Sequence, residues 1–179
     1  MPEIEIRSAR ADDIELLKSF EHGYYTEFVW QFGLQTGPEI AEVDFRRVRL
    51  PRKLFVSYPH QRNRILRNLD QIEAVLVALI AGEPVGYIKI KAERQNRIAR
   101  VTDLIIASKM RRNGIASGLL LAGLELSSSR GFQNMILEVQ SKNDPAIQMA
   151  HKLGFEFCGF RDHYFPNQEL ALFYNRMTR

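Results

Sequence analysis

The sequence predicts an α/β (α+β) fold in which a mixed β-sheet carries helices on both faces. Short runs rich in Val, Ile and Leu, typical of buried strands, recur through the second half of the chain. Stretches with apolar residues at helical spacing lie between these runs. From the third run onward the order is strand, helix, strand, helix, strand, strand, and this alternation implies a mixed sheet covered by helices on both sides.

The first expected elements are a short strand and a helix. Ile4 and Ile6 alternate with charged neighbours, as residues of a half-buried strand do. Asp12 or Asp13 is a favourable N-cap for a helix over residues 14–20, where apolar residues recur at helical spacing.

The following part of the chain carries weaker signals. Residues 24–36 are rich in aromatic side chains and are predicted to be helical. Residues 37–58 favour no single element, so their structure is left open. Residues 60–69 are predicted to form a short basic helix.

Strand signals become clear after residue 72. An apolar run over residues 74–81 meets a turn at Gly82-Glu83-Pro84 and continues over 85–91, which predicts a two-stranded hairpin. A third strand is predicted over 97–106. Its alternation slips at Thr102-Asp103-Leu104, which is typical of a β-bulge.

The remaining elements alternate between helix and strand. Residues 114–129 are predicted to be a helix with one apolar face. A strand over 135–139 follows, then a helix over 144–153 that Gly154 ends, and then two C-terminal strands.

Length and composition predict one domain over residues 1–179, without repeat, linker or low-complexity tract. Cys158 is the single cysteine, which excludes an internal disulfide framework, and its strand context predicts a buried side chain. The longest apolar run, 74–81, is far shorter than the ~20 residues of a membrane helix. We therefore expect a soluble, cytoplasmic protein without a membrane partner.

The net charge of +4 is unevenly distributed. Between Phe45 and Leu69 the chain carries eight Lys or Arg and no acidic residue, so the rest carries 17 basic and 21 acidic residues. Such a segment can receive phosphates or an acidic partner. The alternative is that its apolar residues, Leu54 and Phe55 among them, are core contacts while its arginines are solvated.

The turn before the helix over 114–129 is the most informative segment. Arg111-Arg112-Asn113-Gly114 links a strand to a helix, so backbone N–H groups and the positive end of the helix dipole converge there. Gly114 allows close approach of a ligand, and the two arginines are expected to supply mobile positive charge. These features predict a pyrophosphate cradle. The turn lacks the Lys-Ser/Thr pair of a P-loop and the G-x-G-x-x-G of a dinucleotide site.

Several motifs in order resemble one enzyme family. Arg111-x-x-Gly114-x-Ala116 resembles the signature of the GNAT acetyltransferases. The family's later segments follow at the expected distances: Leu137-Glu138-Val139, Asn143-x-x-Ala146 and Lys152-Leu153-Gly154-Phe155. Residues 138–155 resemble the ribosomal-protein-alanine acetyltransferases. Asp103-Leu104-Ile105 and Tyr164-Phe165-Pro166 resemble the streptothricin acetyltransferases.

For the fold, this resemblance implies a mostly antiparallel mixed sheet of six to seven strands with one splayed parallel pair. It divides the chain into an acceptor-side half, 1–70, and an acetyl-CoA-binding half, 71–179. The implied cofactor-binding residues are Leu104, Ile105, Ile106, Arg111, Arg112, Asn113, Gly114, Ile115, Ala116, Ser117 and Asn143. Asn143 is also a favourable helix N-cap, and one side chain can serve both roles.

The resemblance also implies a general base. Acetyl transfer from a thioester requires a neutral amine, yet a lysine-like amine has a pKa near ~10.4. Glu138 matches the family position of the base, and Asp103 is the other candidate. The alternative interpretation makes Glu138 a structural or substrate-anchoring carboxylate. A backbone N–H of residues 104–106 would stabilise the oxyanion of the tetrahedral intermediate.

The expected general acid departs from the family pattern. A tyrosine usually lies seven residues after Asn143, but this chain has Ala150 there. Tyr164 and His151 are the candidates to protonate the leaving thiolate, with Tyr164 preferred as catalytic residue. Unassisted departure is the third alternative, because a thiol pKa near ~8.5 tolerates it.

Taken together, the motifs predict an acetyl-CoA-dependent N-acetyltransferase that uses no metal. The amine of a small molecule or peptide would attack directly within a ternary complex. A non-catalytic CoA-binding domain and a nucleic-acid-binding module that uses the basic segment are the alternatives. If the basic segment lines the acceptor groove, it would repel polycationic acceptors. Family members often pair as homodimers, and the sequence leaves this open.

Overall fold

The structure, a computed structural model, describes residues 3–58 and 72–178. Within these ranges, nine strands form one seven-stranded sheet and one two-stranded ribbon, and three α-helices accompany them. The strands are β1 (Glu5–Ser8), β2 (Tyr24–Thr36), β3 (Ala41–Val56), β4 (Ile72–Ile80), β5 (Glu83–Glu93), β6 (Ile98–Ile106), β7 (Asn134–Gln140), β8 (Glu156–Arg161) and β9 (Ala171–Met177). The helices are α1 (Ala11–Ser19), α2 (Ile115–Ser129) and α3 (Asp144–Lys152).

The large sheet contains one parallel pair. Its order is β1-β4-β5-β6-β7-β9-β8, and every described neighbour pair is antiparallel except β6 and β7. These two strands pair only from Ile98 opposite Asn134 to Val101 opposite Leu137. Beyond that point they separate. The predicted mixed, mostly antiparallel sheet with a splayed parallel pair is therefore confirmed.

The predicted bulge in β6 is also confirmed. Lys89 of β5 lies opposite Asp103, whereas the next residue, Ile90, lies opposite Val101. Thr102 therefore has no partner in β5. The extra residue changes which face of the sheet the following side chains of β6 point to.

Strand alternation places buried side chains on both faces of the large sheet. Leu76 and Ala78 of β4 belong to a buried cluster with Leu119 of α2 and residues of α3. The intervening Val77 and Leu79 pack with Leu17 of α1. Helices on both faces, as the sequence predicts, bury these two sets of side chains.

Helix α1 is capped differently from the prediction. Its N-cap is Arg10, and Asp13 lies in the first turn instead. The Asp13 carboxylate accepts a hydrogen bond from the Arg10 backbone N–H at 2.6 Å and forms an ion pair with Arg7 at 2.7 Å. The prediction of Asp12 or Asp13 as N-cap was wrong, because Asp13 stabilises this helix end by reaching back to the cap backbone.

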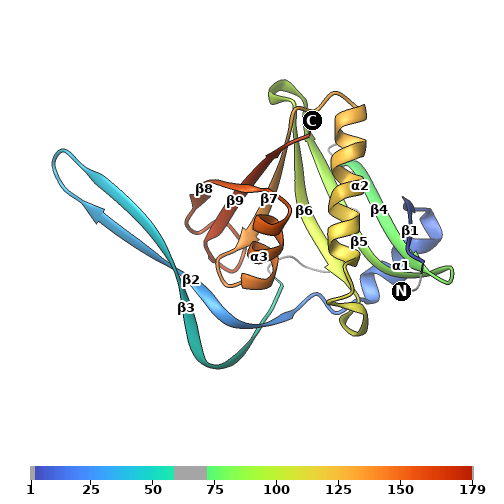
Figure 1. Ribbon diagram of the computed structural model, residues 1–179, viewed down its shortest axis with the longest axis horizontal. Helices are drawn as coiled ribbons and strands as arrows, with labels where there is room; N and C mark the ends of the chain where they lie inside the picture. Colours follow the sequence, from blue (N-terminus) through green and yellow to red (C-terminus); the bar gives the residue numbers. More distant parts are fainter. Residues whose placement is uncertain (1–2, 59–71, 179) are drawn as a thin grey trace.

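The predicted helix over 24–36 was wrong, since these residues form β2. They pair with β3 in a long two-stranded ribbon that extends away from the large sheet (Figure 1). Phe28, Trp30, Phe32 and Leu34 recur at every second position, which is the period of a strand. The residues left open, 37–58, supply β3.

The described part of the basic segment, residues 45–58, is largely solvated, and most of it lies on this ribbon. The Arg46 side chain is 80% exposed and pairs with Asp44. Leu54 and Phe55 are 41% and 43% exposed, so the interpretation that they are core contacts was wrong. The predicted basic helix over 60–69 lies outside the described residues. No described helix has the length and apolar character needed to cross a membrane.

Candidate active site at the splayed strands

Two clefts meet where β6 and β7 separate. The helix-side cleft, of about 760 Å³, is lined by the N-terminal turns of α2 and α3 and by the near ends of β2 and β3. The strand-side cleft, of about 930 Å³, is lined by β5, β6, β7 and β8 and by the loop before β9. Thr102, Asp103 and Glu138 line both clefts. A molecule in one cleft can therefore meet a molecule in the other at these residues.

The turn before α2 has the geometry of an anion cradle. Arg112 and Gly114 both adopt left-handed backbone conformations, with φ of 68° and 79°. This turns successive N–H groups toward one side, where the first turn of α2 adds its unpaired N–H groups. A Cβ built on Gly114 would meet no atom within 4 Å, so the space above the turn is open. Arg112, Gly114, Ile115, Ala116 and Ser117 line the helix-side cleft.

Arg111 has a different part in this turn from the predicted one. Its guanidinium donates to the carbonyls of Ile106, Gly23 and Glu21 at 3.0, 2.8 and 2.7 Å. Arg111 thus ties the turn to the loop between α1 and β2, and the prediction that it supplies mobile charge was wrong. The side chain of Asn113 likewise braces the turn, donating to the Met110 carbonyl at 3.1 Å. Arg112 of the same turn is exposed.

Two further groups of predicted cofactor-binding residues line the same cleft. Leu104, Ile105 and Ile106 lie on β6 beyond the last residue paired with β7, so their backbone on that side faces the opening between the strands. Asn143 is the N-cap of α3, and its Oδ1 accepts from the Ala146 N–H at 3.2 Å. Among the described residues its side-chain NH₂ has no protein partner, so this group is available to a ligand.

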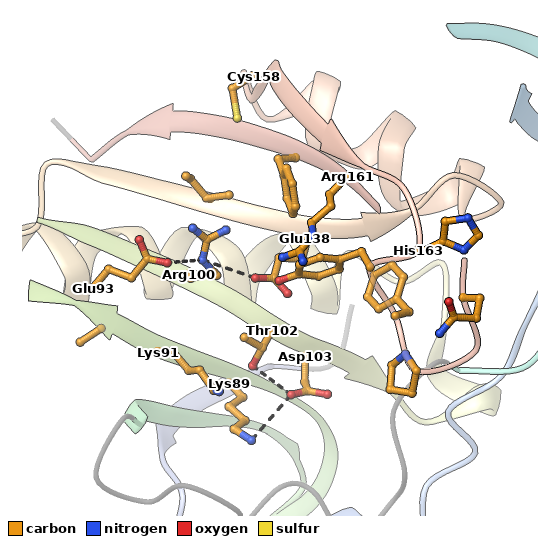
Figure 2. A pocket seen from close by; sticks show the side chains of 17 residues that line it. Lys89, Lys91, Glu93, Arg100, Thr102, Asp103, Glu138, Cys158, Arg161 and His163 are labelled. Carbon is orange, nitrogen blue, oxygen red and sulfur yellow. Dashed lines mark hydrogen bonds and ion pairs between the residues drawn. The ribbon is translucent and has the colours of Figure 1, made fainter. Parts of the chain in front are cut away.

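Glu138 lies at the junction of the two clefts. Figure 2 shows it among the residues that line the strand-side cleft. Its neighbours Leu137 and Val139 pack on the helix side, so Glu138 points to the opposite face of the sheet. The side chain is 5% exposed, and its Oε1 lies 3.4 Å from Nε of Arg100. Burial raises the pKa of Glu138 above 4.5, although Tyr164, Arg100 and Lys91 act in the opposite direction. A carboxylate so placed can accept a proton nearer neutral pH.

Tyr164 joins Glu138 from the loop before β9. Its hydroxyl interacts with the Glu138 carboxylate, and burial together with that negative charge raises the pKa of Tyr164 well above its usual value. The phenol therefore stays protonated throughout the physiological range and can act as a donor.

Asp103, the other candidate base, is already engaged. Its carboxylate accepts from the Tyr58 hydroxyl and from the Thr102 hydroxyl, both at 3.0 Å. Nζ of the buried Lys89 lies 3.9 Å away. The Asp103 carboxylate is thus already occupied by three partners, so Glu138 is the candidate base better placed to receive an amine.

Three other sequence interpretations concern residues near this site. Ala150 is fully buried in the larger core cluster, and its methyl group offers no polar atom. His151 lines neither cleft and instead packs against Trp30 and Tyr174, which excludes it as the acid. The prediction that Cys158 is buried was wrong, because it lies at a register shift of the edge strand β8 and is exposed in the strand-side cleft.

Sequence reasoning missed Arg100, Tyr58 and Tyr24. Arg100 bonds Glu93 at 2.6 Å and holds Glu138 beside it. Tyr24 donates to Oε1 of Gln140 at 2.9 Å at the base of the ribbon. The alternation of β6 predicts which face Arg100 occupies, but no local pattern links Tyr58 or Tyr24 to residues that lie so far along the chain.

Comparison with known proteins gives a consistent result. The model of the acetyltransferase (GNAT) family matches residues 39–155. A streptothricin acetyltransferase of Streptomyces lavendulae is 27% identical over 160 residues, covering 87% of this chain and 82% of the relative. The crystal structure of nourseothricin acetyltransferase has a TM-score of 0.82 at 22% identity, covering 98% of this chain and 99% of that chain. A Bacillus anthracis protein in complex with acetyl coenzyme A has a TM-score of 0.77 at 18% identity, covering 98% and 99% of the two chains.

Proposed function

The chain belongs to the acetyltransferase (GNAT) family, and from this we propose that Glu138 takes a proton from an amine that enters through the strand-side cleft. The protein is an acetyl-CoA-dependent N-acetyltransferase. The observation that carries the proposal is the junction of two clefts at one buried carboxylate. One cleft has the anion cradle, and the other gives a second reactant access to the same carboxylate.

The helix-side cleft suits the acetyl donor. The amides from Arg112 to Ser117 would hold the pyrophosphate, and the NH₂ of Asn143 would donate a further hydrogen bond. The backbone of Leu104, Ile105 and Ile106, on the side that faces away from β5, would bond the pantetheine arm. When bound, acetyl-CoA supplies the acetyl group as a thioester.

Direct transfer follows from the shared junction. The amine nitrogen forms a bond to the acetyl carbon, and the carbon–sulfur bond breaks. Glu138 accepts the proton that the amine loses, either directly or through one water. Backbone N–H groups of β6 beyond Val101 would stabilise the negative charge that develops on the carbonyl oxygen.

Tyr164 would complete the proton balance by donating its hydroxyl proton to the leaving thiolate. Tyr164 would thus serve in place of the tyrosine that the family usually has at the position of Ala150. Its interaction with Glu138 supports this assignment, because a proton can then pass from Glu138 back to Tyr164 after each turnover.

Initial-rate kinetics with acetyl-CoA and a panel of primary amines test this function. Release of CoA that depends on the amine, with intersecting double-reciprocal lines, is the expected result for a ternary complex. Parallel lines would indicate an acetyl-enzyme instead. Release that does not depend on any amine would overturn the proposed transfer.

A further inference from the structure

The strand-side cleft carries more positive charge than its carboxylates neutralise. Its described lining includes the cations Lys89, Lys91, Arg100 and Arg161 and the carboxylates Glu93, Asp103 and Glu138. With all of them ionised, the lining is net positive. Because this is the cleft through which the proposed function brings the amine, its charge bears on which amines it accepts.

The three carboxylates already have cationic partners. Glu93 and Glu138 lie 2.6 and 3.4 Å from the guanidinium of Arg100. Asp103 lies 3.9 Å from Lys89. No carboxylate of this lining is therefore left to bind a second ammonium group of an acceptor, once Glu138 has served the reacting amine.

Lys91 and Arg161 are the two cations without such a partner among the described residues. Lys91 projects from β5, and its charge acts on Glu138. Arg161 ends β8, and its guanidinium lies 5.7 Å from the centre of the Tyr164 ring. Figure 2 shows Arg161 on one side of Glu138 and Lys91 on the other. The two cations thus line the same cleft as the proposed base.

We infer that the acceptor is a primary amine that also carries an anionic group, a carboxylate or a phosphate, and that Lys91 and Arg161 bind this group. This inference rests on the proposed function. An amine bound at Glu138 places the rest of a small acceptor between these side chains. An anion there gains charge-assisted hydrogen bonds in a partly enclosed site, whereas a second ammonium is repelled.

The chemistry of the cleft also restricts how the anion is bound. Lys91 offers a compact ammonium and Arg161 a planar guanidinium, and both carboxylates and phosphates accept hydrogen bonds from this pair. An acceptor with a neutral amide in place of the carboxylate keeps nearly the same shape but loses the ionic contribution to its binding. Matched pairs of acceptors therefore isolate the predicted effect.

Calorimetry with CoA-loaded protein measures the difference in affinity between the anionic and the neutral member of each pair. The matched probes are leucine against leucinamide and phosphoethanolamine against ethanolamine, with spermidine as a polycation. We expect the anionic member of at least one pair to bind about tenfold more tightly than its neutral analogue. The pair that shows the preference distinguishes a carboxylate from a phosphate.

Variants locate the preference. Lys91→Met and Arg161→Met should each remove most of the preference for the anionic acceptor, whereas Lys91→Arg should retain it. The control Lys18→Met removes a cation outside both clefts and should leave the preference unchanged. The Tm of each variant checks its folding. Equal binding of both members of each pair, tighter binding of spermidine, or no heat with either anionic probe overturns the inference.

The outcomes separate this inference from the proposed function. Release of CoA with neutral amines, without a preference for anionic ones, would leave the transfer intact and remove the anion site. Selective binding of anionic amines without CoA release from any amine would keep the anion site and remove the proposed transfer.

Discussion

Arg47 of β3 and Asp144 of α3 form a bidentate ion pair, with Nε and Nη2 of the guanidinium 2.7 and 2.9 Å from the two carboxylate oxygens. Trp30 of β2 donates its indole N–H to the same carboxylate at 3.2 Å. Asp144 follows Asn143, which lines the helix-side cleft. The ribbon is therefore attached to the helix that contributes to the proposed cofactor site.

We predict that Asp144→Asn loosens this attachment. Burial alone would raise the pKa of Asp144, but the hydrogen bonds from Arg47, Gln148 and Trp30 outweigh it and lower the pKa. Trp30 is the only tryptophan of the chain, so its fluorescence reports the contact without interference. The variant should show a red-shifted emission and a lower Tm.

The matched control is Asp12→Asn, an exposed carboxylate in the first turn of α1. It should change neither signal. A lowered carboxyl pKa stabilises the folded protein above the unfolded value of 3.8 and ceases to do so as pH falls through the folded pKa. The difference between Asp144→Asn and the parent should therefore vanish in strong acid. An unchanged emission at neutral pH would refute the attachment.

Glu138→Gln should lower kcat by about 10²- to 10⁴-fold, because the amide keeps the shape but cannot accept the proton. Its Kd for acetyl-CoA should stay unchanged. Glu125→Gln, at an exposed position of α2, is the control and should retain full activity. Full activity in Glu138→Gln would instead assign the base to Asp103.

The pH dependence of kcat/KM should show an acidic limb with an apparent pKa above 4.5, since burial raises the pKa of Glu138. Activity falls as pH drops through that value.

For the stability of the fold the sign is opposite. A carboxyl group with a raised pKa stabilises the folded state at pH below its unfolded pKa, and this stabilisation is lost as pH rises through the folded pKa. Glu138→Gln should consequently keep or raise the Tm at neutral pH, and a large loss of Tm would contradict this.

Gly114→Glu should abolish the rise in Tm that acetyl-CoA produces, because the new carboxylate fills the cradle and repels phosphate. The matched control is Gly82→Glu. Gly82 has a φ of 82° against 79° for Gly114, and a Cβ there also meets no atom within 4 Å. Both variants carry the same backbone strain, of about 1–2 kcal/mol. Only Gly114→Glu should lose the ligand-induced shift, and an undiminished shift would remove the cradle from the site.

Local patterns predicted the sheet and the proposed cofactor side because each signal there lies within a few residues. The bulge at Thr102 follows from slipped alternation, and the turn at Gly114 from a strand that meets a helix. The prediction of a helix over residues 24–36 was wrong because aromatic content was given more weight than the period-two spacing of Phe28, Trp30 and Phe32. The prediction that Cys158 is buried was wrong because the register shift in β8 depends on its partner strand, β9.

The residues around Glu138 could not be predicted from the sequence, because they come from segments that are far apart along the chain. Arg100 reaches it from the neighbouring parallel strand, and Tyr164 from the loop before β9. Only the sheet order brings these residues together. The resemblance indicated Glu138 and Tyr164 as candidates, whereas their meeting in one cleft and the charge balance of that cleft required the structure.

Tyr164→Phe separates a catalytic role from a packing role. Loss of the hydroxyl removes the proposed proton donor, so kcat should fall while KM for acetyl-CoA stays unchanged. It also removes the hydroxyl whose interaction with Glu138 lowers the pKa of that carboxyl, so the acidic limb should move to higher pH. Tyr174→Phe, whose hydroxyl lines neither cleft, is the control and should alter neither value. A Tyr164→Phe protein with lower kcat but an unmoved acidic limb would show that the hydroxyl does not act on Glu138.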